Sequence, residues 1–353
     1  MSFIQKKYNS LDGLRAYSAL GIVFLHVFTN GKYALKGFAF DWLIPSLTNL
    51  VFLFMILSGF SLCCGYYERI TRNQISVSDF YAKRYAKIWP FFAALVALDV
   101  VTSPSLKSVY EAFANLTLCF GFLPNPKIEV IGVSWTLGVI FVFYLVFPFV
   151  CFLLSTKRRA WLSTIVALIF SVVCKVYFFD ASHMPADYSG RSNFLYCAVF
   201  FLTGGMLYLY RDALEQFARK FWWIVLIACT AATAGYYFLA LPELFVLVPY
   251  ALLMIYAIGN DNSKVLNNPV TRFLSGISME IYLSHMVIYR VVEKLGITHL
   301  FASERLSYIV MMVVVIAGTT VFAVMAKKVL AVLPTLYKNI KDRVMSKNAG
   351  EEL

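Results

Sequence analysis

Charged residues are scarce in this sequence, and acidic residues are the scarcer kind. Only 14% of the 353 residues are charged, with 19 acidic against 31 basic, whereas 60% are hydrophobic and 17% aromatic. Soluble domains average about 25% charged and 45–50% apolar residues. A soluble fold of this length cannot hide so much apolar surface, and aromatic residues at this density exclude a disordered chain. The sequence therefore predicts a multi-pass protein of the cell membrane.

Motifs for metals and disulfides are also lacking. The seven cysteines are odd in number and mostly lie inside apolar runs, and there is no CxxC, HExxH or Cys/His cluster. Neither a zinc site nor a disulfide framework is indicated, and no permanently bound cofactor is expected. The net charge of +12 comes from basic residues that gather between apolar runs. This pattern is typical of the positive-inside rule, so we expect a lipid bilayer and no nucleic acid as partner.

Apolar segments long enough to cross a bilayer recur along the chain, since a spanning helix needs about 20 largely apolar residues. The segment 109–123 is apolar but short, and it contains Glu111 and Asn115. If it does not span, most Lys and Arg residues fall on the inner side; if it does, the bias is lost. The spans expected are 12–30, 43–66, 86–104, 130–154, 160–180, 193–210, 221–240, 243–260, 272–292 and 306–330.

The predicted fold is therefore all-α. It is a membrane bundle of ten transmembrane helices, with 109–123 as a short re-entrant or interfacial helix and both termini in the cytoplasm. Residues 1–8 form an N-terminal tail, 9–333 the membrane domain and 334–353 a cytoplasmic C-terminal tail.

Two polar residues in the first span form the clearest functional pair. Arg15 and His26 lie eleven residues apart in LDGLRAYSALGIVFLH, which on a helix places them roughly 16 Å apart on nearly the same face. Such a pair suits a long donor with an anionic head, because a guanidinium holds phosphate and a neutral imidazole acts as a general base. In the alternative interpretation, Arg15 is a topological anchor and His26 a hydrogen-bonding packing residue.

A basic loop and a late span carry the other candidates. Lys83 and Arg84 precede Pro90 on the same predicted side as Arg15, where they form either a phosphate-binding mouth or a topological signal. In SMEIYLSH, the acid Glu280 and the imidazole of His285 lie inside an apolar run but, five residues apart, do not share a helix face. Ionisable side chains inside a membrane are functional or paired by default.

Two shorter motifs fit packing as well as function. LSGF, residues 57–60, places a serine and a glycine at the end of the second span, where small residues favour close helix contact. SWTL, residues 134–137, opens the fourth span. Its Trp135 falls near the predicted outer surface, where an aromatic residue is expected in any case.

In this order the motifs resemble acyltransferase family 3, the integral-membrane O-acyltransferases typified by bacterial O-antigen and exopolysaccharide O-acetyltransferases. LDGLR, ten residues and a histidine are similar to the first-span signature of that family. LSGF, the basic loop ending at Pro90, SWTL and SMEIYLSH resemble its later motifs. The likeness covers roughly residues 9–330, and five motifs in the correct order make a specific signal.

The resemblance implies an activity that composition cannot show. Family members move an acyl group, usually acetyl, from cytoplasmic acyl-CoA to a hydroxyl of an envelope carbohydrate or lipid-linked glycan. Acetyl-CoA or another acyl-CoA would then be the donor substrate. The residues expected in this site are Arg15, Lys83 and Arg84 for the coenzyme phosphates, His26 for the acceptor hydroxyl, and Trp135 and His285 for substrate binding.

One stretch departs from the family pattern. Many members carry acidic residues soon after the motif that SWTL resembles, where this sequence has Ile140 and Phe141. Either that carboxylate is dispensable, or another acid such as Glu280 or Asp12 assists His26. We take Glu280 as the catalytic candidate, because Asp12 fits the N-cap of the first helix.

Two other classes of protein stay open. A transporter or flippase of a lipid-linked glycan or small solute is favoured by broken helices in two inverted halves, and the sequence has no such symmetry. A scaffold without chemistry leaves His26 and Glu280 without a role. Acetyl-CoA binding, which only the acyltransferase requires, separates the three. The acyl group (acetyl or succinyl), the acceptor and the oligomeric state are open at this point.

Overall fold

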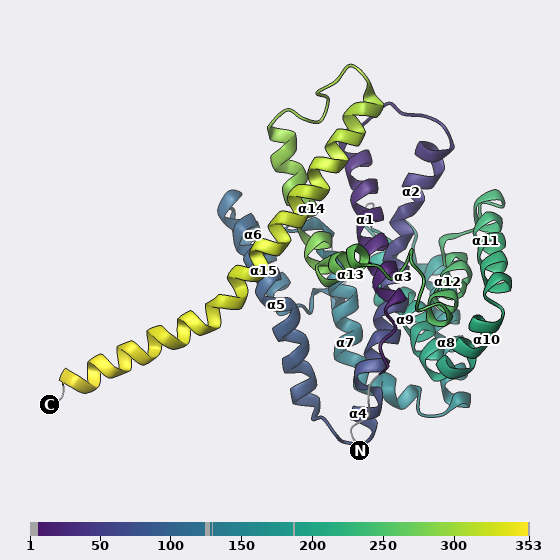
Figure 1. Ribbon diagram of the computed structural model, residues 1–353, viewed down its shortest axis with the longest axis horizontal. Helices are drawn as coiled ribbons and strands as arrows, with labels where there is room; N and C mark the ends of the chain where they lie inside the picture. The colour runs from purple at the N-terminus through teal and green to yellow at the C-terminus, as the bar shows by residue number, and fades with distance from the viewer. Residues whose placement is uncertain (1–5, 124–127, 129, 186–187, 352–353) are drawn as a thin grey trace.

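The computed structural model describes residues 6–123, 128, 130–185 and 188–351, with side chains described as far as residue 332. Over these ranges the chain forms helices and no strand, which confirms the predicted all-α class (Figure 1). The α-helices are α1 (Ser10–Gly31), α2 (Ile44–Ser46), α3 (Leu50–Leu62), α4 (Glu68–Thr71), α5 (Val77–Thr102), α6 (Leu106–Thr117), α7 (Trp135–Leu153), α8 (Lys157–Val173), α9 (Phe194–Leu209), α10 (Arg211–Lys220), α11 (Trp222–Phe238), α12 (Leu247–Gly259), α13 (Pro269–Gly276), α14 (Ser278–Lys294) and α15 (Glu304–Glu351).

Each of the ten apolar segments predicted as spans coincides with helix. Among the described residues, six helical runs are long and apolar enough to cross a membrane. A seventh is gained if α9 and α10, which meet at an angle of 77°, count as one bent span. Helices α11 and α12 are apolar but shorter. The structure therefore supports a multi-pass bundle with six to seven spans by length and composition.

The doubtful segment 109–123 overlaps helix α6 (Leu106–Thr117), whose 12 residues are too few to cross a bilayer. One side of α6 exposes the apolar residues Tyr110 and Phe113, whereas Asn115 is fully buried. The Asn115 side chain accepts a hydrogen bond from Ser134, just before α7, and the Glu111 carboxylate accepts one from the backbone of Val130. The two polar residues thus bind Val130 and Ser134, which directly precede α7.

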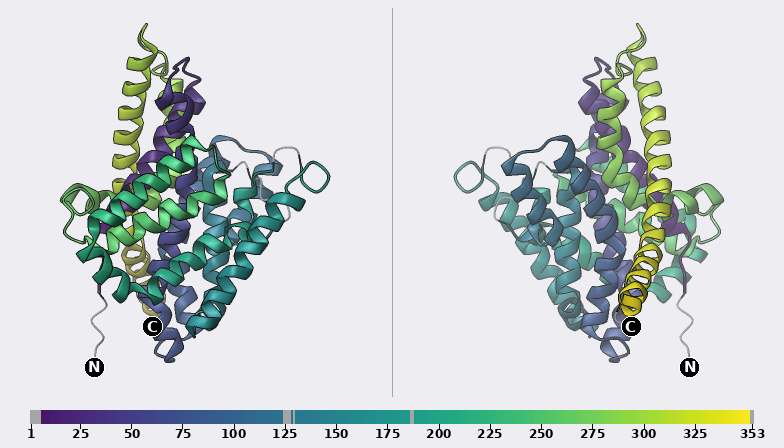
Figure 2. Two further views of the ribbon diagram at one scale, coloured as in Figure 1. Left: turned by 90° about the vertical axis from the view of Figure 1, so that its right-hand side faces the viewer. Right: turned by 90° about the vertical axis from the view of Figure 1, so that its left-hand side faces the viewer.

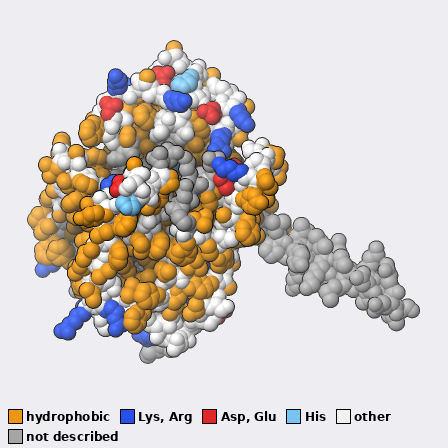
Figure 3. All heavy atoms as spheres, turned by 180° about the vertical axis from the view of Figure 1, so that it is seen from behind, with side chains coloured by type: hydrophobic (Ala, Val, Ile, Leu, Met, Phe, Trp, Pro, Cys, Tyr) orange, Lys and Arg blue, Asp and Glu red, His pale blue; other side chains and the backbone are white. Residues whose placement is uncertain are grey.

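Hydrophobic side chains cover a broad band of the face seen in Figure 3, with Lys and Arg at its lower edge and residues of both charges above it. The helical run Lys157–Phe178, which contains α8, is typical of this surface, since only 17% of its apolar 18-residue window is buried in the protein. Such a band is what an aqueous protein avoids and a bilayer requires.

Helix α1 lies in the middle of the bundle. It packs against α3 on one side and against α13, α14 and α15 on the other (Figures 1 and 2). Most of its residues are small or aliphatic, and 13 of the 22 are buried. Helix α15 continues through the region predicted as a tail and leaves the bundle at its C-terminal end (Figure 1).

The LSGF motif brings α3 against α9 at backbone contact. A Cβ atom added to Gly59 would lie 2.1 Å from the carbonyl oxygen of Phe201, and one added to Gly204 would lie 2.1 Å from that of Ile56. No side chain fits at either position. The neighbouring Ser58 lines a cavity, so the motif combines packing with a contribution to the site.

We therefore expect Gly59→Ala to destabilise the protein by about 1–3 kcal/mol, the usual cost of overpacking. The matched control is Gly235→Ala in α11, where an added Cβ meets nothing within 4 Å. The midpoint of thermal unfolding in detergent should fall for Gly59→Ala and stay level or rise for Gly235→Ala. Equal midpoints in the two variants would disprove the close contact.

Candidate active site

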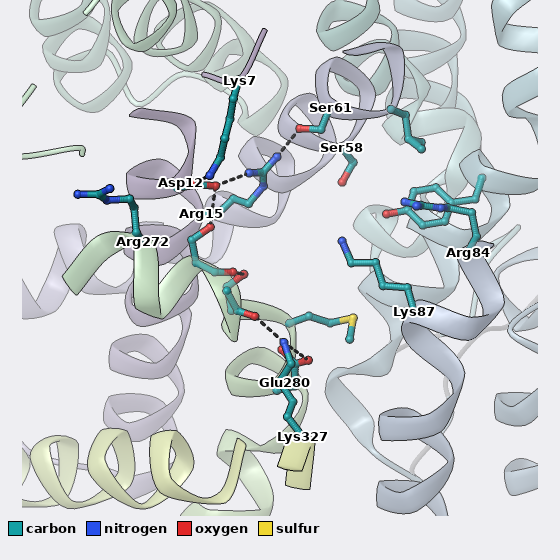
Figure 4. A pocket seen from close by; sticks show the side chains of 16 residues that line it. Lys7, Asp12, Arg15, Ser58, Ser61, Arg84, Lys87, Arg272, Glu280 and Lys327 are labelled. Atoms are coloured by element: carbon teal, nitrogen blue, oxygen red, sulfur yellow. Dashed lines mark hydrogen bonds and ion pairs between the residues drawn. The ribbon is translucent and has the colours of Figure 1, made fainter. Parts of the chain in front are cut away.

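The N-terminal end of α1 opens on a cavity of about 660 Å³, here called the basic pocket. Side chains from α1 and the segment before it, and from α3, α5, α7, α13, α14 and α15, surround it (Figure 4). Cations outnumber acids in its lining, so the field inside favours an anion. The charged residues that line the basic pocket are Lys7, Arg15, Arg84, Lys87, Arg272 and Lys327, with Asp12 and Glu280.

Arg15 is held in place by two neighbours. Its Nη1 donates to Oδ1 of Asp12 at 2.9 Å, and its Nη2 donates to the hydroxyl of Ser61, the residue after LSGF. Asp12 also accepts a hydrogen bond from Ser275 at 3.0 Å. The interpretation of Asp12 as the N-cap is wrong, because the cap position is Asn9 and Asp12 lies in the first turn. There its carboxylate orients the guanidinium.

The basic loop is part of helix α5, and only one of the two residues predicted there reaches the basic pocket. Arg84 lines it, stacked over the ring of Tyr66 at 4.7 Å and donating to the Tyr66 hydroxyl at 2.6 Å. Lys83 is exposed and is not among the lining residues. Lys87 lines the pocket instead, because it follows Arg84 by three residues and shares its helix face.

Glu280 is buried in α14 and lines the basic pocket. Its Oε1 lies 3.4 Å from Nζ of Lys327 on α15, which also donates to the carbonyl of Gly276 at 2.7 Å. His26 lies in a different cavity, and no hydrogen bond or ion pair joins it to Glu280. Within the described side chains, Glu280 therefore lies at the basic pocket and not beside His26, the predicted base.

His26 lines a second cavity of about 160 Å³, here called the histidine cavity. Its Nδ1 lies 2.6 Å from Nε2 of His285, which is completely buried in α14. On its other side, Nδ1 of His285 lies 2.7 Å from the backbone carbonyl oxygen of Tyr282. The prediction that Glu280 and His285 do not share a face holds, since one faces the basic pocket and the other contacts His26.

The histidine cavity also has an aromatic and a cationic wall. Trp135, which the sequence predicts as a substrate-binding residue, lines it together with Arg191 from the segment before α9. Nε of Arg191 donates to Glu243 at 2.9 Å, and its Nη1 donates to the hydroxyl of Thr48, another lining residue. Arg191 and Glu243 together carry no net charge. Among the described residues, Nη2 of Arg191 makes no hydrogen bond and so keeps its N–H groups for a ligand in the cavity.

The SWTL motif fixes the Trp135 wall against α14. The Tyr282 hydroxyl donates to Oγ1 of Thr136 at 2.7 Å, so the carbonyl that binds His285 belongs to a residue tied to SWTL. Further along α7, Phe141 is buried against the ring of Tyr85. An apolar core therefore occupies the position where the resemblance would lead one to expect an acidic residue.

Sequence reasoning missed several residues of the two cavities. Lys327 carried a usable signal, a cation within the last apolar run. Lys7 lies in the N-terminal segment before α1 and Arg191 in a connecting segment, and neither gave a signal that it lines a cavity. Within the described part of the chain, no group of three or more His, Cys, Asp or Glu side chains is placed to hold a metal ion.

Fold and cavities together define a multi-pass membrane protein in which α1 contributes Arg15 to the basic pocket and His26 to the histidine cavity. The family model of the acyltransferase domain, acyltransferase family 3, matches residues 8–326, and the chain belongs to this family. A curated relative, acyltransferase MdmB from Streptomyces mycarofaciens, is 31% identical over 194 residues, which is 50% of this chain and 48% of that protein. The alignment thus spans about half of the relative's length. No solved structure matches.

Proposed function

We propose that this membrane acyltransferase moves an acyl group, most simply acetyl, from cytoplasmic acyl-CoA to a hydroxyl of an envelope carbohydrate. The observation that carries the proposal is the division of one helix between two cavities. Arg15 lies in a basic pocket with five further cations, and His26 lies in a separate small cavity. A donor with several phosphates at one end and a reactive thioester at the other matches this division.

The basic pocket suits coenzyme A in charge and in size. Phosphate oxygens would contact Arg15, Arg84 and Lys87, with Lys7, Arg272 and Lys327 around them. Such charge-assisted contacts are among the stronger hydrogen bonds. The extended pantetheine arm would then cover the roughly 16 Å that eleven helical residues set between Arg15 and His26. Lys83, predicted from the sequence as a further phosphate ligand, would act at most at the pocket entrance.

The reaction assigned to His26 is general-base acyl transfer. A ring nitrogen of His26 takes the proton of the acceptor hydroxyl while its oxygen bonds to the thioester carbonyl carbon. The carbon–sulfur bond then breaks, and the leaving thiolate takes the proton from His26. Atoms and charge balance without a metal or a redox partner, and the products are an ester and free coenzyme A.

The histidine cavity is the acceptor site in this proposal. Trp135 offers an aromatic face to a sugar ring, and Arg191, already neutralised by Glu243, offers N–H donors to hydroxyl or ring oxygens without adding net charge. Its volume of about 160 Å³ limits the group that enters to about one ring. This arrangement favours a neutral, hydroxyl-bearing acceptor over an anionic one.

The test supplies membranes containing the protein with acetyl-CoA labelled in its acetyl group and follows the label into envelope glycan. Label in glycan with the wild type supports transfer. Donor binding without transfer to any glycan would overturn the carbohydrate acceptor. Absence of both would overturn the acyltransferase proposal and favour the transporter alternative.

Replacement of Arg191 separates the two cavities. We expect Arg191→Gln to reduce label transfer to glycan by about tenfold or more, since it removes charged hydrogen-bond donors from the acceptor cavity. Acetyl-CoA binding, measured by equilibrium dialysis of the solubilised protein, should stay at the wild-type value. Weaker donor binding with unchanged transfer would assign Arg191 to the donor instead.

A further inference from the structure

Neither cavity has the completely buried His285 in its lining, although the sequence had predicted it as a substrate-binding residue. We propose that His285 is a positioning residue that fixes the proton of His26 on Nδ1 and leaves Nε2 of His26 as the base. This inference rests on the proposed function for its catalytic meaning. The position of the proton on His26 does not depend on the proposed function.

The chain of reasoning starts at a backbone carbonyl. The oxygen of Tyr282 lies 2.7 Å from Nδ1 of His285, and a carbonyl oxygen can only accept a hydrogen bond. Nδ1 of His285 must therefore carry a proton. Two acceptors at this separation would repel each other, so the assignment does not depend on the rest of the site.

The next step concerns the other nitrogen of the same ring. No carboxylate contacts His285 among the described residues, and the ring is completely buried, so an uncompensated positive charge there would be costly. The ring is then neutral, with its single proton on Nδ1. Its Nε2 is left with a lone pair and can only accept.

The last step passes to His26. Nε2 of His285 lies 2.6 Å from Nδ1 of His26, and since Nε2 accepts, Nδ1 of His26 must donate. A neutral His26 then has its lone pair on Nε2. No described side chain hydrogen bonds to that Nε2, and the ring lines the histidine cavity. The free nitrogen is the one available to an acceptor hydroxyl.

The relative position of the two rings fits a hydrogen bond better than a stack. Their planes differ by 18° and their centroids are 4.9 Å apart. This separation is close to the 2.6 Å between the nitrogens plus two imidazole radii of about 1.1 Å each. The two nitrogens therefore lie near the line joining the ring centres. An N–H and a lone pair in the ring planes then point at each other, as a strong hydrogen bond requires.

This chain of hydrogen bonds does the work that the aspartate does in a Ser-His-Asp triad, where holding the wrong tautomer costs about 10⁴ in kcat. When Nε2 of His26 takes the hydroxyl proton, the imidazolium keeps its Nδ1–H bond to His285. That bond becomes charge-assisted and stabilises the protonated base. It supplies the partner that Ile140 and Phe141 cannot, without a carboxylate.

The direct test is nitrogen NMR of the full-length protein, labelled with ¹⁵N-histidine and held in lipid bilayers without substrate. The chain has only four histidines, so spectra of His183→Asn, His299→Asn and His26→Gln assign the signals. We expect protonated Nδ1 and bare Nε2 on both His26 and His285. In His285→Phe, the His26 signals should change to a mixture of tautomers. A protonated Nε2 on His26 of the wild type would overturn the proposal, and so would an unchanged His26 tautomer in His285→Phe.

Kinetics supply the second readout. His285→Phe should lower kcat for label transfer by on the order of 10²-fold or more, with KM for acetyl-CoA unchanged. His285→Gln should recover most of this loss, because its side-chain carbonyl can accept from Nδ1 of His26. Equal losses in the two variants would overturn the positioning role. If no variant, nor the wild type, transfers label while the NMR result stands, the proposed function fails and the proton assignment does not.

Discussion

Replacing His26 by alanine is expected to lower kcat for acyl transfer by about 10²- to 10⁴-fold, the usual contribution of a positioned general base. Acetyl-CoA binding should remain at the wild-type value, because no residue is common to the linings of the histidine cavity and the basic pocket. The measurement pairs initial rates of label transfer with equilibrium binding of the donor, so that chemistry and binding are read separately.

A second variant and a rescue experiment guard against a simple folding defect. His26→Gln keeps most of the side-chain volume and a hydrogen-bond acceptor for the cavity but no base. We expect it to be as inactive as His26→Ala. Free imidazole should restore part of the rate in His26→Ala only, because only that variant has room for it. Full activity in both variants would remove His26 from the chemistry, and weakened donor binding in both would reassign it to the donor site.

The distance along α1 could be predicted because it lies within one element. Eleven residues at 100° each return to nearly the same face, and the structure places Arg15 and His26 in cavities at two levels of the same helix. The same argument separated Glu280 from His285 on α14. Apolar runs likewise located the long apolar helices of the bundle, because burial in lipid requires that composition over that length. The short polar helix α10 was not predicted.

The partners of these residues could not be predicted, because they depend on how distant segments pack. His285 lies 259 positions from His26, and no local pattern indicates that α14 brings the two rings together. The choice of Lys87 over Lys83 depends on the rotation of α5 about its axis, which is set by the helices that pack against it and which the sequence of α5 alone does not fix. Arg191 reaches its cavity from a connecting segment, where periodicity gives no information.

For Glu280, the rule that a carboxylate inside a membrane is functional or paired holds, but its partner differs from the one expected. An intramembrane carboxylate is functional or paired, and sequence reasoning offered it to His26 as the missing acid. In the structure its ion pair is with Lys327, at the basic pocket. Glu280 therefore acts mainly by positioning Lys327. We expect Glu280→Gln to change the affinity for the donor more than it changes kcat.

Removing the charge of Arg15 from the basic pocket is expected to produce the largest change in the affinity for the donor. We predict that Arg15→Gln raises KM for acetyl-CoA by about 10- to 100-fold, the value of a hydrogen bond to a charged group, with kcat little changed. Arg15→Lys should recover only part of the loss, because a lysine cannot reproduce a planar fork held between Asp12 and Ser61. Lys294→Gln, an exposed charge at the other end of α14, is the matched control.

Variants of Lys83 and Lys87 test the prediction made from the sequence motif against the arrangement seen in the structure. Both are four-carbon cations on α5, but only Lys87 lines the basic pocket. Lys87→Gln should therefore raise KM for acetyl-CoA, and Lys83→Gln should leave it near the wild-type value. The reverse order would favour the prediction made from the motif and would mean that the donor binds at the pocket entrance.

The donor itself can then report which cation meets which phosphate. Acetyl-dephospho-CoA lacks the 3′-phosphate, so it should bind the wild type more weakly than acetyl-CoA does. A variant that has lost the cation facing this phosphate should discriminate less between the two donors. Removing the cation and removing the phosphate abolish the same interaction, so the second loss has little further effect. Salt should weaken binding of the full donor more than that of the shortened one. If every variant in the basic pocket kept the wild-type discrimination, the 3′-phosphate would lie outside the pocket, and the cations lining it would hold only the pyrophosphate.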